Sequence, residues 1–147
     1  MRSILISIVL VTFFGFASCK KEDSSILTQI PEVTAAASTG TWRITYYLDS
    51  ETDKTNLFSG YAFTFNSNST LTAVKAAENV SGTWSVSNSS DDDSPSDLDF
   101  NILFTTPAAF EDLSDDWDIL EATAVKIKLI DISGGSGETD YLTFEKN

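Results

Sequence analysis

Residues 61–86 alternate between apolar and polar side chains in three successive runs that are separated by polar turns. In the first run, Tyr61, Phe63 and Phe65 fall at every second position. A period of two places one set of side chains on a buried face and the other set toward water, which is typical of a β-strand at the edge of a core. Because the turns at residues 66–69 and 77–79 are short, this stretch predicts a three-stranded antiparallel meander.

Five further runs with the same alternation bring the predicted total to eight strands. They span residues 42–49, 98–104, 117–122, 125–129 and 141–145. Eight short strands with mostly short connections favour an all-β fold, an eight-stranded antiparallel up-and-down barrel, because a closed barrel leaves no exposed strand edge. A two-sheet sandwich would use strands of the same length and stays an alternative. Thr106, Pro107 and the alanines after them predict one short helix between strands five and six.

The first eighteen residues have the features of an export signal. Arg2 supplies a positive charge, residues 4–16 form an apolar run too short to span a bilayer comfortably, and small residues precede Cys19. Residues 16–19, Phe-Ala-Ser-Cys, resemble the lipobox of bacterial lipoproteins. The resemblance implies cleavage before Cys19 and attachment of acyl lipid, such as palmitate, to this residue. An ordinary secretory signal is the alternative.

This interpretation divides the chain into a signal peptide at residues 1–18, a lipidated cysteine with a flexible tether at residues 19–39, and a barrel domain at residues 40–147. The lipid would be the membrane anchor. Residues 20–23, Lys-Lys-Glu-Asp, resemble the signal that sends Bacteroidota lipoproteins to the outer face of the outer membrane. We therefore expect the protein to be exposed at the cell surface, with the periplasmic face of the outer membrane as the second choice. We also expect it to be a monomer.

Four short motifs resemble the lipocalin-like lipoproteins of Bacteroidota. They are Gly40-Thr41-Trp42, Phe63-Thr64-Phe65-Asn66, Gly82-Thr83-Trp84 and Tyr141-Leu142-Thr143-Phe144. The resemblance implies a barrel that binds a small hydrophobic ligand. Lipocalins place an arginine from a late strand over the first tryptophan, and Lys146 is the candidate for that role here.

The interior of an eight-stranded barrel is either filled by side chains or holds one small molecule. If a pocket exists, aromatic residues on the predicted inner face would line it, with Tyr46 or Tyr61 orienting the ligand through a hydroxyl group. The candidate ligand-binding residues are Trp42, Tyr46, Tyr61, Phe63, Trp84 and Phe100. Because the predicted inner face is bulky, a solid core is the competing interpretation. The protein would then contact a partner protein or glycan through loops such as residues 88–97.

Charge and composition exclude several functions. With 22 acidic and 9 basic residues, the formal charge is −13, which argues against binding nucleic acid. The sequence has no histidine and no phosphate-binding glycine loop, so we expect neither an enzyme nor a cofactor or metal site. A hydrolase using two carboxylates is the remaining catalytic alternative. Two sets of acidic residues offer oxygen atoms to calcium but lack the spacing of a calcium-binding loop. The first set is Asp91, Asp93 and Asp97, and the second is Glu111, Asp112, Asp115 and Asp116.

Overall fold

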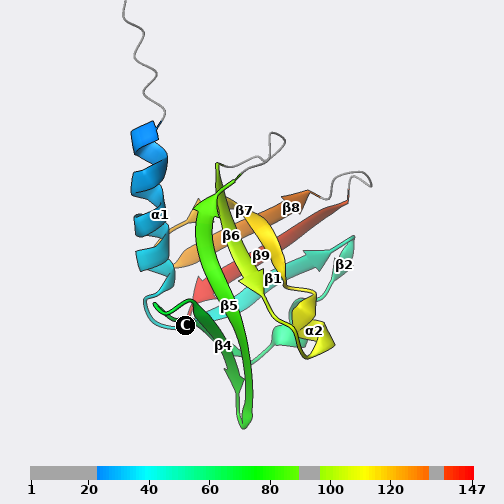
Figure 1. The fold of residues 1–147 in the computed structure, drawn as a ribbon. Coiled ribbons are helices and arrows are strands. Elements are labelled where there is room, and N and C mark those ends of the chain that lie inside the picture. Colours follow the sequence, from blue (N-terminus) through cyan, green and yellow to red (C-terminus); the bar gives the residue numbers. More distant parts are fainter. Residues whose placement is uncertain (1–22, 90–96, 133–137) are drawn as a thin grey trace, which may run out of the picture.

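The computed structural model describes residues 23–89, 97–132 and 138–147 (Figure 1). The predicted signal peptide, Cys19 and the residues up to Glu22 lie outside this part of the chain, as do Asp91 and Asp93. In chain order the elements are α1 (Asp23–Ala37), β1 (Trp42–Asp49), β2 (Thr52–Asp53), the 3-10 helix η1 (Thr55–Phe58), β3 (Ala62–Phe65), β4 (Thr70–Lys75), β5 (Glu78–Asn88), β6 (Leu98–Leu103), α2 (Ala108–Glu111), β7 (Asp115–Ala122), β8 (Lys126–Ile132) and β9 (Thr139–Lys146).

The predicted antiparallel barrel is confirmed. Strands β3 to β9 pair with their neighbours in chain order, and β1 closes the sheet by pairing with β9 along most of its length. The other edge of β1 meets β3 at one pair of partners, Trp42 and Phe63. The two-residue strand β2, which the sequence did not predict, pairs only with the end of β1. The eight predicted strands therefore form the closed barrel, and β2 is an addition at its edge.

A bulge in β1 changes which side chains enter the core. The β1–β9 register shifts between Ile44 and Tyr46, so that Tyr46 pairs with Thr143 and Tyr47 pairs with Leu142. An extra residue in one strand turns every later side chain to the opposite face. Tyr47 is consequently buried, whereas Tyr46 is 41% exposed. The predicted inward position of Tyr46 is wrong for this reason.

The core fills the barrel with large side chains. The bulkiest residues below 2% exposure are Trp42, Trp117, Tyr47, Phe58, Phe63, Phe65, Phe100, Phe104, Phe144, Leu71, Leu113 and Ile127. Most of them were predicted to face inward from the alternation alone. Val125, the first residue of the run predicted at 125–129, is 63% exposed, because β8 begins only at Lys126.

The flexible tether predicted for residues 19–39 is wrong from Asp23 onward, because Asp23–Ala37 forms helix α1 with Pro31 inside it. The helix stands beside the barrel in Figure 1. Ala37 at its end is fully buried, and Val33 packs against the core. Burial of this face supplies the stabilisation that a proline-containing segment lacks on its own. No helix within the described residues has the length and apolar character needed to cross a membrane.

Helix α2 lies between β6 and β7, which are the fifth and sixth of the predicted strands. It begins at Ala108, since Pro107 has an extended conformation and Thr106 makes no cap. Phe110 in this helix and Leu113 after it are buried. The helix therefore covers one end of the barrel.

Candidate functional site

The predicted ligand-binding residues that face the core contact other side chains rather than an open space. Phe65 is at the centre of this group, with its ring centroid 6.4 Å from that of Trp42, 5.2 Å from Trp84 and 5.2 Å from Phe100. The rings of Trp84 and Phe100 stack on each other at 5.6 Å. Distances of 4.5 to 7 Å between ring centroids are those of directly packed aromatic pairs. These residues therefore form one packed cluster.

The polar atoms of this cluster already have partners. The indole nitrogen of Trp42 donates a hydrogen bond to the carbonyl oxygen of Ala37 at 2.9 Å. The indole nitrogen of Trp84 donates to the carbonyl oxygen of Asn66, also at 2.9 Å. Neither tryptophan therefore offers a free donor to a ligand inside the barrel.

A second aromatic group closes the barrel end beneath α2. Phe110 contacts Phe58, Tyr61 and Phe104 with ring centroids 5.3, 5.1 and 5.1 Å apart. Phe63, another predicted ligand-binding residue, lies against Phe58 and Phe110 at 6.4 and 6.2 Å. Phe58 and Phe110 thus fill this end of the barrel with packed rings.

The two candidate tyrosines do not present hydroxyl groups to an interior pocket. Tyr46 lies on the outer face of β1. The Tyr61 hydroxyl donates a hydrogen bond to a carboxylate oxygen of Glu78 at 2.5 Å, and this bond raises the Tyr61 pKa. Lys75 Nζ lies 5.2 Å from the centroid of the Tyr61 ring. Tyr61 therefore belongs to the rim of the barrel.

Tyr47, which takes the inward position, holds α2 in place. Its hydroxyl donates to the carbonyl oxygen of Asp112 at 2.5 Å. Burial raises the pKa of this tyrosine far above its usual range, and the charges of Asp49 and Asp112 add to the effect. The ammonium group of Lys54 bonds both of these carboxylates, the one on Asp112 at 2.7 Å. These contacts join β1, η1 and α2, and we assign them a structural role.

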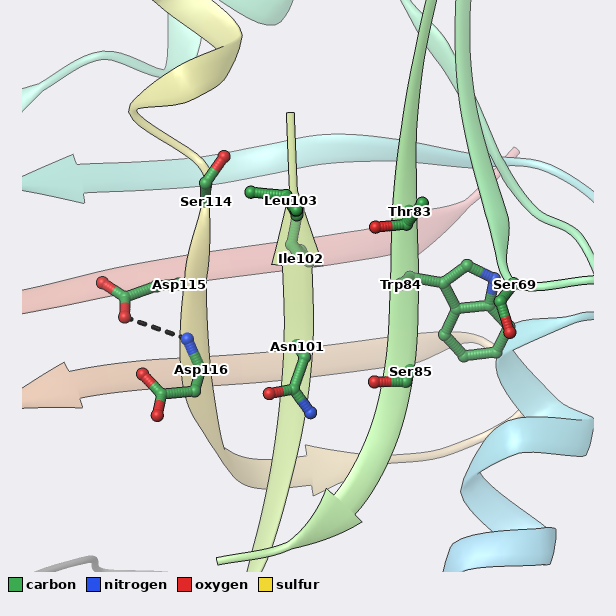
Figure 2. A pocket seen from close by; sticks show the side chains of 10 residues that line it. All are labelled: Ser69, Thr83, Trp84, Ser85, Asn101, Ile102, Leu103, Ser114, Asp115 and Asp116. Carbon is green, nitrogen blue, oxygen red and sulfur yellow. Dashed lines mark hydrogen bonds between the residues drawn. The ribbon is translucent and has the colours of Figure 1, made fainter. Parts of the chain in front are cut away.

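A pocket of about 630 Å³ lies on the outer face of β5, β6 and β7 (Figure 2). Its lining residues are Ser69, Thr83, Trp84, Ser85, Asn101, Ile102, Leu103, Ser114, Asp115 and Asp116. Trp84 and Ile102 have their side chains in the core, whereas Thr83, Ser85 and Asp116 are exposed. The register places Ser85 opposite Asn101 and Asn101 opposite Asp116. One row of polar side chains therefore crosses three adjacent strands.

Some polar groups of the pocket are engaged and others are open. Asn101 Nδ2 donates to Ser87 Oγ at 2.9 Å, and the Ser114 hydroxyl bonds both the amide and the carbonyl group of Phe104. Within the described residues, the hydroxyl groups of Thr83 and Ser85 make no hydrogen bond, and the exposed carboxylate of Asp116 interacts with that of Asp115. These groups are available to a ligand.

Asp115 sits at one wall of this pocket, where β7 begins. Its Oδ1 accepts a hydrogen bond from the amide of Asp116 at 2.9 Å, drawn as the dashed line in Figure 2. Burial raises the pKa of Asp115 to about 6, and the neighbouring Asp116 and Asp131 add to the shift. The carboxyl group therefore lies in an environment that disfavours a second negative charge.

A smaller hollow of about 350 Å³ lies between α1 and the end of β7. Gln29, Glu32 and Val33 of the helix face Leu120 and Glu121 across it. The hollow results from the packing of α1 beside the barrel.

The acidic groups do not assemble a metal site in the part of the chain that is described, where no cluster of three suitable side chains occurs. Of the calcium candidates, Asp91 and Asp93 lie outside the described residues. Asp115 and Asp116 line the outer pocket, whereas Asp112 is bonded to Lys54.

The outer pocket is not among the sites that the sequence predicts. Alternation places Thr83, Ser85 and Asn101 on the polar side of their strands, which predicts only contact with water. The available signal was that the polar faces of two paired strands carry small hydroxyl and amide groups in place of long charged side chains. Sequence alone does not show that this part of the surface is concave.

No protein-family model matches the sequence. Comparison with curated proteins gives no significant match. Among solved structures, the chain is similar to the crystal structure of a DUF4847 family protein from Bacteroides vulgatus, with 15% sequence identity and a TM-score of 0.47. The match covers 78% of this chain and 97% of that chain. At this level of similarity it assigns neither a family nor a function.

Proposed function

We propose that the protein is a non-enzymatic, lipid-anchored binding module of the bacterial cell envelope. In this proposal the barrel is a lipocalin-like scaffold with a solid core, and a polar ligand binds in the pocket on the outer face of β5, β6 and β7. The export signal and the lipobox-like residues before Cys19 support the anchor. The Lys-Lys-Glu-Asp sequence after Cys19 supports display on the outer membrane surface, with the periplasmic face as the second choice.

The observation that carries the proposal is the contrast between the interior and the outer face. Inside the barrel, Phe63, Phe65 and Phe100 have no exposed surface and pack ring against ring. A ligand of even a few carbon atoms would have to displace these rings, and opening a packed core costs several kcal/mol, on the order of 2 to 5 for one large side chain. The outer pocket, by contrast, offers about 630 Å³ and exposed polar side chains from three adjacent strands.

Binding of a small apolar molecule in the barrel is the second candidate function, and the four lipocalin-like motifs favour it. It requires rearrangement of the plug formed by Phe58 and Phe110, because their rings are in direct contact at 5.3 Å. We rank it below outer-face binding for this reason.

The lipid anchor is tested by Cys19→Ser. We expect the wild-type protein in the membrane fraction, and the variant in the soluble fraction, since one acyl-modified cysteine is the proposed anchor. A variant that stays with the membrane would remove the lipoprotein interpretation.

The binding site is tested by filling the pocket from one of its strands. Ser85→Tyr places a ring in the pocket, whereas Ser81→Tyr places the same ring on the same face of β5 outside it. Both variants and the wild-type mature chain, with Cys19→Ser to block lipidation, are screened against an array of soluble sugars, amines and short peptides. We expect a ligand that binds wild type and the Ser81 variant but not the Ser85 variant. A ligand that binds all three equally, or stoichiometric uptake of a fatty acid, contradicts the proposal.

A further inference from the structure

The outer pocket has negative groups and no positive group of its own. Asp116 lies on the outer face of β7 with Asp115 next to it at the start of the strand, and none of the ten lining residues is a lysine or an arginine. The other groups at its surface are hydroxyls, the Asn101 amide and the side chain of Leu103, which is 54% exposed. This composition is unfavourable for an anionic ligand.

The basic side chains of the described residues are engaged elsewhere. Arg43 and Lys126 pair with Glu145, Lys128 pairs with Glu121, and Lys54 pairs with Asp49 and Asp112. Lys75 and Lys146 lie over the rings of Tyr61 and Trp42. Within the described part of the chain, no cation therefore compensates the carboxylates of the pocket.

We propose that the outer pocket binds a primary ammonium or guanidinium group. This inference rests on the proposed function and names the ligand chemistry of the same site. Such a group has several hydrogen-bond donors and no acceptor. It therefore matches a wall of carboxylate, amide and hydroxyl oxygen atoms.

The pairing register of β5, β6 and β7 places the acceptor groups close enough together for one ligand to contact them. Ser85, Asn101 and Asp116 are direct partners on β5, β6 and β7, and adjacent strands are separated by about 4.8 Å. The three side chains thus follow one another across the pocket at a spacing that one ligand spans. The amide nitrogen of Asn101 is already bonded to Ser87, so its oxygen atom is the group left to accept a bond from a ligand.

Charge separates this ligand class from neutral sugars. A sugar would use the same hydroxyl and amide groups but would gain nothing from the carboxylates as charges. The protein as a whole carries a formal charge of −13, which attracts a cation from a distance and accelerates its association. Binding of a cation should therefore weaken when salt screens the charges, with a Debye length of about 8 Å at physiological ionic strength.

The test is isothermal titration calorimetry of the mature chain, with Cys19→Ser to block lipidation. The probes are spermidine, a tetralysine peptide with blocked ends, and maltotriose. Spermidine represents a free amine, and the peptide represents lysine side chains of a partner protein. We expect saturable binding of at least one cationic probe, weakened severalfold between 0.05 and 0.5 M salt as charges are screened, on the order of 3-fold to 10-fold.

Two isosteric variants locate the charge effect. Asp116→Asn removes a carboxylate of the pocket, and we expect affinity for the cationic probe to fall about tenfold, the value of one charge-assisted hydrogen bond. Glu51→Gln removes a charge from the exposed turn between β1 and β2, outside the pocket, and should leave the affinity within about twofold. Circular dichroism of both variants checks that they are folded.

The outcomes separate the two proposals. Cation binding that weakens about tenfold in Asp116→Asn and is lost in Ser85→Tyr supports both of them. Binding of maltotriose that is lost in Ser85→Tyr but unchanged in Asp116→Asn overturns the cationic ligand and leaves the binding site in place. No binding of any probe at 10 mM overturns the cationic ligand, and equal cation binding by Ser85→Tyr and Ser81→Tyr overturns the pocket as well.

Discussion

The ammonium group of Lys146 lies 4.2 Å from the centroid of the Trp42 ring. Trp42 begins the first barrel strand and Lys146 ends the last one, and the two are also partners in the β1–β9 register. Lys146 Nζ reaches the carbonyl oxygen of Ala36 at 3.5 Å, next to the Ala37 carbonyl that accepts the Trp42 indole hydrogen bond. One cation thus joins both ends of the barrel sheet and the end of α1. The predicted position of Lys146 over the first tryptophan is therefore confirmed.

We predict that Lys146→Met lowers the free energy of unfolding by about 1 kcal/mol, because it removes the cation above the ring while keeping a similar length of apolar chain. Lys146→Arg should stay within about 0.5 kcal/mol of wild type, since a guanidinium group also packs on an indole face. Urea denaturation monitored by tryptophan fluorescence measures both. Equal stability of the methionine variant and wild type would show that the contact contributes nothing.

Gly82 is required where β5 passes β6. A Cβ atom at this position would lie 2.4 Å from the carbonyl oxygen of Leu103 and 2.7 Å from Cδ1 of Phe104. We predict that Gly82→Ala destabilises the protein by about 2 kcal/mol or more, because a backbone atom cannot yield as a flexible side chain can. Ser81→Ala, at the exposed neighbouring position, should change the stability by less than about 0.5 kcal/mol. Thermal unfolding of the two variants distinguishes these results, and a mild effect at Gly82 would contradict the close approach.

The turn between β4 and β5 contains a strained residue. Ala76 has φ of 52°, a left-handed conformation, whereas the next residue, Ala77, has a negative φ. We predict that Ala76→Gly stabilises the protein by about 0.5 kcal/mol, because glycine adopts this conformation without steric cost. Ala77→Gly should destabilise it by a similar amount through greater flexibility of the unfolded chain. Chemical denaturation measures the change in the free energy of unfolding for both variants. A change of the same sign in the two would contradict the strained conformation of Ala76.

Asp115 makes stability depend on pH. Its pKa is raised from 3.8 to about 6, so the folded state holds a proton that the unfolded chain releases. Stability therefore falls as pH rises between these two values and stays low above pH 6. We predict that Asp115→Asn is more stable than wild type by about 1 kcal/mol at pH 8, allowing for solvent screening, and equal to it near pH 4.

The control for this prediction has the opposite sign. Hydrogen bonds from Thr55 lower the pKa of Asp53, so its contribution to stability is present at neutral pH and is lost as pH falls below the ordinary value of 3.8. Asp53→Asn should therefore be less stable than wild type at pH 8, with the difference disappearing in acid. Stability curves from pH 3 to pH 8 compare the variants, and parallel curves for Asp115→Asn and wild type would contradict the raised pKa.

Alternation in the sequence was sufficient to predict the strands and most of the core. Phe63, Phe65 and Phe100 were placed correctly because a period of two leaves only one choice of face while a strand stays regular. The bulge between Ile44 and Tyr46 broke that condition, and nothing in the composition of β1 distinguished Tyr46 from Tyr47. The polar pairs at the end of β1 hold Tyr47 inward, and they come from residues distant in the chain, such as Asp112.

Helix α1 was missed for a different reason. Pro31 and the many small polar residues predict a tether, although Ile30, Val33 and Ala37 recur at helical spacing. Proline disfavours a helix interior, but burial of Ala37 and the hydrogen bond that its carbonyl accepts from the Trp42 indole outweigh that preference. Phe58 was missed because a single aromatic residue after a polar loop carries no periodic signal, and only the barrel gives it a place to pack.

The central claim is that the barrel interior is filled and that ligands bind outside it. The most direct measurement is an amide NMR titration of the mature chain, with Cys19→Ser, using spermidine and palmitate as separate ligands. We predict saturable shifts at Thr83, Ser85, Asn101 and Asp116 with spermidine and no shift in the core with palmitate. Saturable shifts at Phe63, Phe65 and Phe100 with palmitate, without change on the outer face of β5 to β7, would contradict this account.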